Sequence, residues 1–152
     1  MKKVVIYVVL LFLALMMPVR GTDVGKLIPV ELLRIDKEEE SVIIMTDLGV
    51  SGTGATVEAA IENLKLTAAG VIFLDTADYL IIDDGARQEG AALEEHLNPS
   101  VRVCISDGEI DMEKAAAYLD THEPKTKLRD YDSSGTYEIL TTENGKMILK
   151  EN

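Results

Sequence analysis

Apolar residues spaced three and four positions apart predict three helices. The three apolar faces consist of Val57, Ala60, Ile61, Leu64 and Ala68; of Ala86, Gly90, Leu93 and Leu97; and of Met112, Ala115, Ala116 and Leu119. Thr56, then Asp83 or Asp84, and then Asp111 stand just before these faces, so we expect them to be the N-caps. Each helix therefore carries both a start signal and a face to bury.

Runs of branched and long aliphatic residues predict the strands. Residues 28–35 and 41–48 flank a polar turn, so we expect a hairpin in which Pro29 marks the start or an edge of the first strand. The glycine-containing residues 49–54 predict a loose loop between this hairpin and the first helix.

Further strands follow each helix. Residues 71–74 and 79–82 are either two short strands or one strand with a bulge, and residues 101–105 alternate as a strand should. A C-terminal hairpin is predicted around Asn144-Gly145, because this pair accepts the positive φ angles of tight hairpin turns.

The order of these elements predicts the α/β (α+β) class: a mixed β-sheet with about three helices packed on it, plus the C-terminal β-hairpin. We expect residues 22–122 to form the mixed α/β domain, residues 123–135 a linker, and residues 136–152 the hairpin. The sequence leaves open whether the hairpin joins the main sheet or accepts a strand from another chain.

Residues 1–21 have the order of a secretory leader. Lys2 and Lys3 precede an unbroken apolar run, Val4–Met17, which is shorter than the roughly 20 residues that a membrane-crossing helix needs. We therefore expect a signal peptide, with a short uncleaved membrane anchor as the alternative. Either outcome places the domain outside the cytoplasm, secreted or membrane-associated.

The net charge limits which partners the domain can bind, and the single cysteine limits which covalent bonds it can form. A net charge of −12 is repelled by nucleic acid phosphates and by anionic lipid headgroups, so we expect neither to bind directly to the mature domain. Cys104 has no second cysteine to pair with, and its place in an apolar strand predicts a buried free thiol.

No segment carries a strong signature of a cofactor or of catalysis. Residues 49–56 connect a strand to a helix, as phosphate-binding loops do, but their glycine spacing matches neither the dinucleotide fingerprint nor the P-loop. His96 and His122 have no nearby nucleophile motif and no second histidine at a metal-ligand spacing. We expect no cofactor, no catalytic residue and no metal site.

Four segments together resemble the N-terminal domain of the Ger(x)C family, the C-type subunits of spore germinant receptors. They are the hairpin with Ile35-Asp36, the helix start Gly54–Leu64, the segment Ile72–Ala86 with its paired strands, and the closing strand and helix start Val101–Gly108. The resemblance covers residues 27–119 and implies a non-enzymatic, extracytoplasmic accessory module.

The chain departs from that family in three ways. Its leader lacks the lipoprotein cysteine, residues 75–78 stand where the family has a histidine, and the family's further domains are replaced by a linker and one hairpin. The resemblance therefore implies a module reduced to one domain, with spore germination as a possible setting.

These observations predict an exported protein-binding domain whose partner is a membrane or cell-envelope protein. Exposed connections carry function more often than buried elements do, so the candidate binding residues are Ser51, Thr53, Asp75, Thr76 and Asp78. Two alternatives stay open: a small secreted hydrolase, and an acidic cell-surface binder of a ligand or of calcium through Asp75 and Asp78.

Overall fold

The computed structural model describes residues 27–151, and the predicted leader lies outside them. Seven strands form one mixed sheet in the order β4-β3-β2-β6-β7-β8-β9. The strands are β2 (Leu32–Glu38), β3 (Ser41–Thr46), β4 (Ser51–Gly54), β6 (Tyr79–Asp83), β7 (Arg102–Ser106), β8 (Ile139–Glu143) and β9 (Lys146–Lys150). The helices are α2 (Val57–Thr67), α3 (Arg87–Ala92) and α4 (Met112–Leu119). The predicted α+β class is confirmed.

The centre of the sheet is parallel and its flanks are antiparallel. β2, β6, β7 and β8 run in parallel, whereas β3 and β4 on one flank and β9 on the other pair antiparallel to their neighbours. Parallel neighbours need crossover connections, and here the connections carry the helices. The β2–β3 hairpin is confirmed, with Glu39 in its turn at a φ of 52°.

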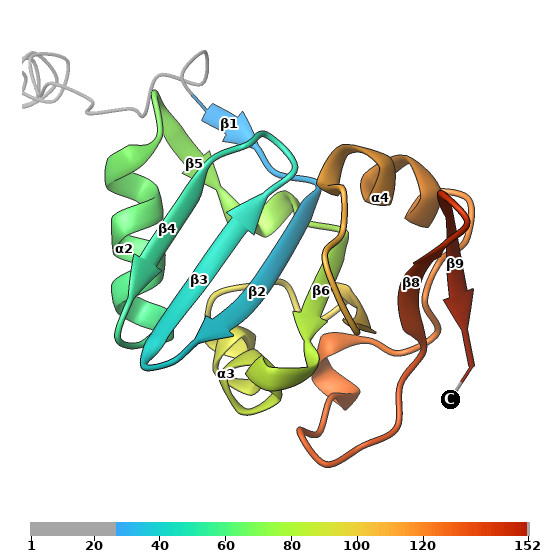
Figure 1. The fold of residues 1–152 in the computed structure, drawn as a ribbon. Helices are drawn as coiled ribbons and strands as arrows, with labels where there is room; N and C mark the ends of the chain where they lie inside the picture. Colours follow the sequence, from blue (N-terminus) through green and yellow to red (C-terminus); the bar gives the residue numbers. More distant parts are fainter. Residues whose placement is uncertain (1–26, 152) are drawn as a thin grey trace, which may run out of the picture.

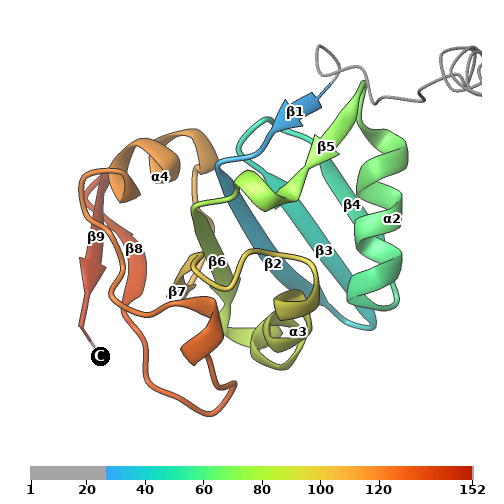
Figure 2. The ribbon, with the colours of Figure 1, turned by 180° about the vertical axis from the view of Figure 1, so that it is seen from behind.

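The two faces of the sheet are covered unequally (Figures 1 and 2). On one face, the apolar sides of α2 and α3 pack with Leu33, Leu80 and Val103 in the larger core cluster. On the other face α4 packs over the half that contains β6 to β9, where Ile81 and Cys104 belong to a second cluster. The prediction that the Cys104 thiol is buried is confirmed, and burial raises its pKa.

The strand predicted for residues 28–35 is in fact two strands. β1 (Leu27–Pro29) pairs in parallel with β5 (Val71–Phe73) as a separate two-stranded ribbon, and β2 begins only at Leu32. Pro29 has no N–H to continue a ladder, and the chain turns after it. Residues 71–82 likewise form two short strands and not one strand with a bulge, because β5 and β6 belong to different sheets.

The glycine-rich loop expected at residues 49–54 is a further correction, because Ser51–Gly54 is strand β4, paired antiparallel with β3. The glycines allow α2 to pack directly on this strand. A Cβ atom at Gly52 would lie 2.2 Å from the Ala60 carbonyl oxygen, and one at Gly54 would lie 2.5 Å from the Ala60 nitrogen. The glycines therefore serve close packing of a strand on a helix, and the expected flexible loop was wrong.

The first and third predicted helices form with their expected caps, whereas Asp83 caps the 3₁₀ turn before α3 and α3 itself follows Ala86 without a side-chain cap. Thr56 Oγ1 accepts a hydrogen bond from the Ala59 N–H, and Asp111 accepts one from Lys114. The second helix is more irregular than predicted, since α3 is flanked by the 3₁₀ turns Asp84–Ala86 and Leu93–Glu95. Its apolar positions are nonetheless buried.

Residues 123–135, expected as a linker, contribute to the core. Leu128 is buried in the larger cluster and donates its N–H to the Val101 carbonyl. The C-terminal hairpin joins the main sheet, because β8 pairs in parallel with β7 through Ile105–Ile139. The linker and the hairpin therefore pack onto the same sheet as the preceding domain.

We expect Gly52→Ala to lower the free energy of unfolding by about 1–3 kcal/mol, because its Cβ would overlap the α2 backbone. Urea denaturation followed by circular dichroism measures this change. Gly108→Ala is the matched control, since nothing lies within 4 Å of its Cβ position, and should alter stability by less than about 0.5 kcal/mol. Equal stability of the two variants would contradict the proposed role of Gly52.

Candidate functional site

Half of one sheet face has no helix over it. On the side of the sheet that carries α4, no helix lies over β3, β4 and the C-terminal part of β2, whereas Leu32 at the start of β2 is buried in the second cluster (Figure 1). Their side chains on this side are cross-strand neighbours, and we call this surface the open face: Arg34, Asp36, Glu38, Ser41, Ile43, Met45, Ser51 and Thr53. Most antiparallel strand pairs with one wet side alternate in this way.

The centre of the open face is apolar and its β4 edge carries hydroxyl groups. Ile43 lies opposite Thr53, and Met45 lies opposite Ser51. Ile43 and Met45 are half-buried, whereas both hydroxyl side chains are exposed. The structure thus places the predicted residues Ser51 and Thr53 on an edge strand beside two aliphatic side chains.

A charged cluster lies at the β2–β6 side of the open face, at the carboxyl ends of the parallel strands. Arg34 Nη2 lies 3.1 Å from Asp36 Oδ2 and 3.4 Å from Asp83 Oδ1. The Ser106 hydroxyl donates to the same Asp83 oxygen over 3.4 Å. Three neighbouring strands, β2, β6 and β7, therefore contribute to one polar network.

Burial makes this network important for the sheet. Arg34 is only 6% exposed and Ser106 is fully buried, and the Nε of Arg34 is buried without a hydrogen-bond partner in the described chain. A buried guanidinium requires counter-charges, which Asp36 and Asp83 supply. Their side chains remain 22% and 23% exposed, so the network reaches the surface through its carboxylates.

The hollows on and beside the open face are acidic. One is lined by Ser41, Ile43 and Thr53 together with two glutamates, and another lies between the β3–β4 turn and the start of α4. A third continues along α4 and shares Asp47 and Glu113 with the second. None of their lining residues is a lysine or an arginine; the acidic ones are Glu31, Glu38, Glu39, Asp47, Glu113 and Asp120.

The other predicted site residues lie elsewhere and do not join the open face. Asp75 and Thr76 are in a 3₁₀ turn between β5 and β6, and Asp78 follows it. The Thr76 hydroxyl accepts from the Val30 N–H and donates to a carbonyl, a role that ties β1 to this turn. Within residues 27–151, no group of three or more His, Cys, Asp or Glu side chains is placed to hold a metal ion.

The two histidines sit apart from the open face. The His122 ring stacks on Tyr118 with 4.2 Å between the ring centroids, and its Nδ1 lies 2.8 Å from the Thr121 hydroxyl. His96 Nε2 is buried and has no hydrogen-bond partner among the described residues. Neither imidazole is hydrogen-bonded to a serine in this part of the chain.

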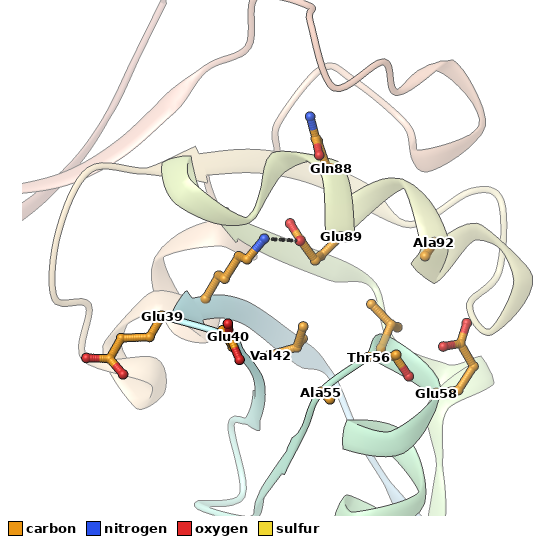
Figure 3. Close-up of a pocket in the computed structure, with 11 residues that line it drawn as sticks. Glu39, Glu40, Val42, Ala55, Thr56, Glu58, Gln88, Glu89 and Ala92 are labelled. Carbon is orange, nitrogen blue, oxygen red and sulfur yellow. Dashed lines mark hydrogen bonds and ion pairs between the residues drawn. The ribbon is translucent and has the colours of Figure 1, made fainter.

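A separate hollow of about 440 Å³ lies between the start of α2 and α3 (Figure 3). Its size is in the range of small-ligand sites, roughly 300–1,000 Å³. Lys37 Nζ is paired there with Glu89 at 2.5 Å. The pKa of Glu58 is lowered, first by its own backbone N–H and then by the Thr56 hydroxyl. Thr56 and Glu58 thus already interact with the N-terminus of α2, and we assign this hollow no ligand.

The sequence analysis missed the network around Arg34. Asp83 was expected as a helix cap, and it does accept a hydrogen bond from the Gly85 N–H. Its second role depends on the register of β6 against β2 and β7, which pairs Asp83 with Ser106. The one available signal was an arginine in the middle of an apolar strand, at Arg34.

Comparison with known proteins adds no relative. The chain matches no protein-family model, no curated protein and no solved structure. The likeness to the Ger(x)C family therefore stays a prediction from the sequence. In residues 27–151, no helix has the length and apolar composition needed to cross a membrane.

We expect Arg34→Met to lower the free energy of unfolding by about 1–3 kcal/mol, because Asp36 and Asp83 would face each other without their shared cation. Arg129→Met is the control, since its pair with Asp130 is exposed and should contribute less than about 0.5 kcal/mol. Urea denaturation of both variants measures the difference. Indistinguishable midpoints would show that the Arg34 network does not stabilise the sheet.

Proposed function

We propose that this chain is an exported, non-enzymatic module that binds a protein partner through its open face. The observation that carries the proposal is the half-covered sheet, whose aliphatic centre, Ile43 and Met45, stays half-buried beside two exposed hydroxyl side chains. Protein interfaces typically combine an apolar centre with a polar rim. The open face has both.

The charge of the surroundings specifies the partner's chemistry. The hollows on and beside the open face are lined by acidic residues and by no basic residue, while Arg34 is already neutralised by Asp36 and Asp83. Complementary charge speeds association and rejects wrong partners. The partner segment is therefore basic at its ends, with an aliphatic or aromatic side chain to cover Ile43 and Met45.

The location of the partner follows from the leader and from the resemblance. The basic start and the apolar run of residues 1–21 support export. The likeness to the Ger(x)C family supports a membrane-bound partner in the cell envelope, with germinant-receptor subunits as the first class to test. On this proposal the module is an accessory component and carries out no chemistry.

Site-specific photocrosslinking in cells of the native host tests the proposal. A photoreactive phenylalanine analogue replaces Thr53 on the open face in one variant and Glu94 in the control variant. Glu94 is exposed on the 3₁₀ turn after α3, in the helical layer behind the sheet. We expect the Thr53 variant, and not the control, to capture one membrane protein.

A charge substitution sharpens this test. Adding Ile43→Glu to the Thr53 variant should reduce capture at least tenfold, since it places a carboxylate at the apolar centre; this factor corresponds to about 1.4 kcal/mol of binding free energy. Gln88→Glu, at an exposed position of α3, adds the same single negative charge and should leave capture unchanged. Capture that is equal from positions 53 and 94, or that survives Ile43→Glu, would refute binding at the open face.

A further inference from the structure

The ribbon of β1 and β5 has an outer face made only of apolar residues. Leu27 pairs with Val71, and Pro29 pairs with Phe73, so these four residues share one side of the ribbon. Ile72, between them in sequence, is buried in the core on the other side. Val71 is 48% exposed and Phe73 is 39% exposed. A ribbon with one side in the core would ordinarily carry polar side chains on its other side.

All the large exposed apolar side chains of the described chain gather at one end of the molecule. Besides Val71 and Phe73 they are Leu66, near the end of α2, and Leu48, in the turn between β3 and β4. The end of α2, the ribbon and this turn lie at the same end in both views (Figures 1 and 2). We call this group, with Leu27 and Pro29, the apolar end.

The apolar end is also where the described chain begins. Residues 18–26 separate the apolar run Val4–Met17 from Leu27, and such a segment spans at most about 30 Å when extended. An apolar run held in a bilayer would thus keep the ribbon within that distance of the membrane. Tethering of this kind raises the effective concentration of a weak second contact.

We propose that the apolar end rests on the surface of a phospholipid bilayer, with residues 1–21 retained as the short membrane anchor that holds the chain there. Leu66 and Phe73 enter the interface between headgroups and acyl chains, where apolar side chains are removed from water. The contact depends on apolar burial rather than on charge, because the chain carries a net charge of −12. The open face then lies beside the membrane, available to an envelope protein.

A bilayer fits these observations better than a second copy of the chain does. The apolar side chains come from three separate elements at one end, and the described chain begins at that end, following the predicted leader in sequence. The inference rests on the export in the proposed function and on the anchor alternative for residues 1–21, but not on the partner at the open face. The two proposals therefore fail separately.

Fluorescence of the full chain in phosphatidylcholine vesicles tests this inference. An environment-sensitive dye is attached to Leu66→Cys, to Phe73→Cys or, as the control, to Glu94→Cys. Cys104 is fully buried and its thiol pKa is raised, so it stays unlabelled in the folded protein. We expect blue-shifted emission at positions 66 and 73, and quenching there by spin-labelled phosphatidylcholine at least threefold stronger than at position 94.

Two results would overturn the proposal. If all three positions are quenched equally, the apolar end does not face the lipid. If positions 66 and 73 are blue-shifted without quenching by the spin-labelled lipid, protein covers them instead, either the leader or a second copy. A loss of Thr53 crosslinking with quenching intact would refute only the proposed partner at the open face.

Discussion

The parallel pairing of β2, β6 and β7 is the constraint on which the rest of this structure depends. Parallel neighbours cannot be joined by tight turns, so the chain must cross the sheet between them. Between β2 and β6 it forms β3, β4, α2 and β5, and between β6 and β7 it forms α3. The helices of both connections pack on the same face of the sheet, which leaves α4 to cover the other face.

One helix of eight residues is too short to cover seven strands. α4 packs over the second core cluster, which includes Tyr79, Ile81 and Leu140, and leaves the outer strands bare. On this face the outer strands carry hydroxyl and charged side chains around Ile43 and Met45, and the buried Arg34 among them is paired with two carboxylates. The open face is thus a consequence of the topology.

On the covered face, β4 has no side chains at all. It has glycine at positions 52 and 54, which allows α2 to pack directly against the strand backbone. Asn63 of α2 also accepts a hydrogen bond from the Thr53 N–H, which satisfies one donor on the free edge of the strand. The same edge strand is therefore packed against α2 on one side and presents Ser51 and Thr53 on the other side.

Local interactions determined what could be predicted from the sequence alone. α2 and α4 follow from apolar spacing and from the caps Thr56 and Asp111. The C-terminal hairpin follows from Asn144-Gly145, whose φ angles are 51° and 75°. Each of these signals acts within a few residues, so it is complete in the sequence. The expected export of the chain likewise depends only on a local order of charged and apolar residues.

Contacts between distant residues decided the rest. In sequence, residues 51–54 resemble a flexible loop, and they form a strand because they pair with β3 and pack against α2. Residues 28–35 resemble one strand, but they are divided because Leu27–Pro29 pairs with β5. The network around Arg34 joins residues up to 72 positions apart in sequence only through the register of β2, β6 and β7. No local pattern carries that register, because it is determined when the sheet assembles.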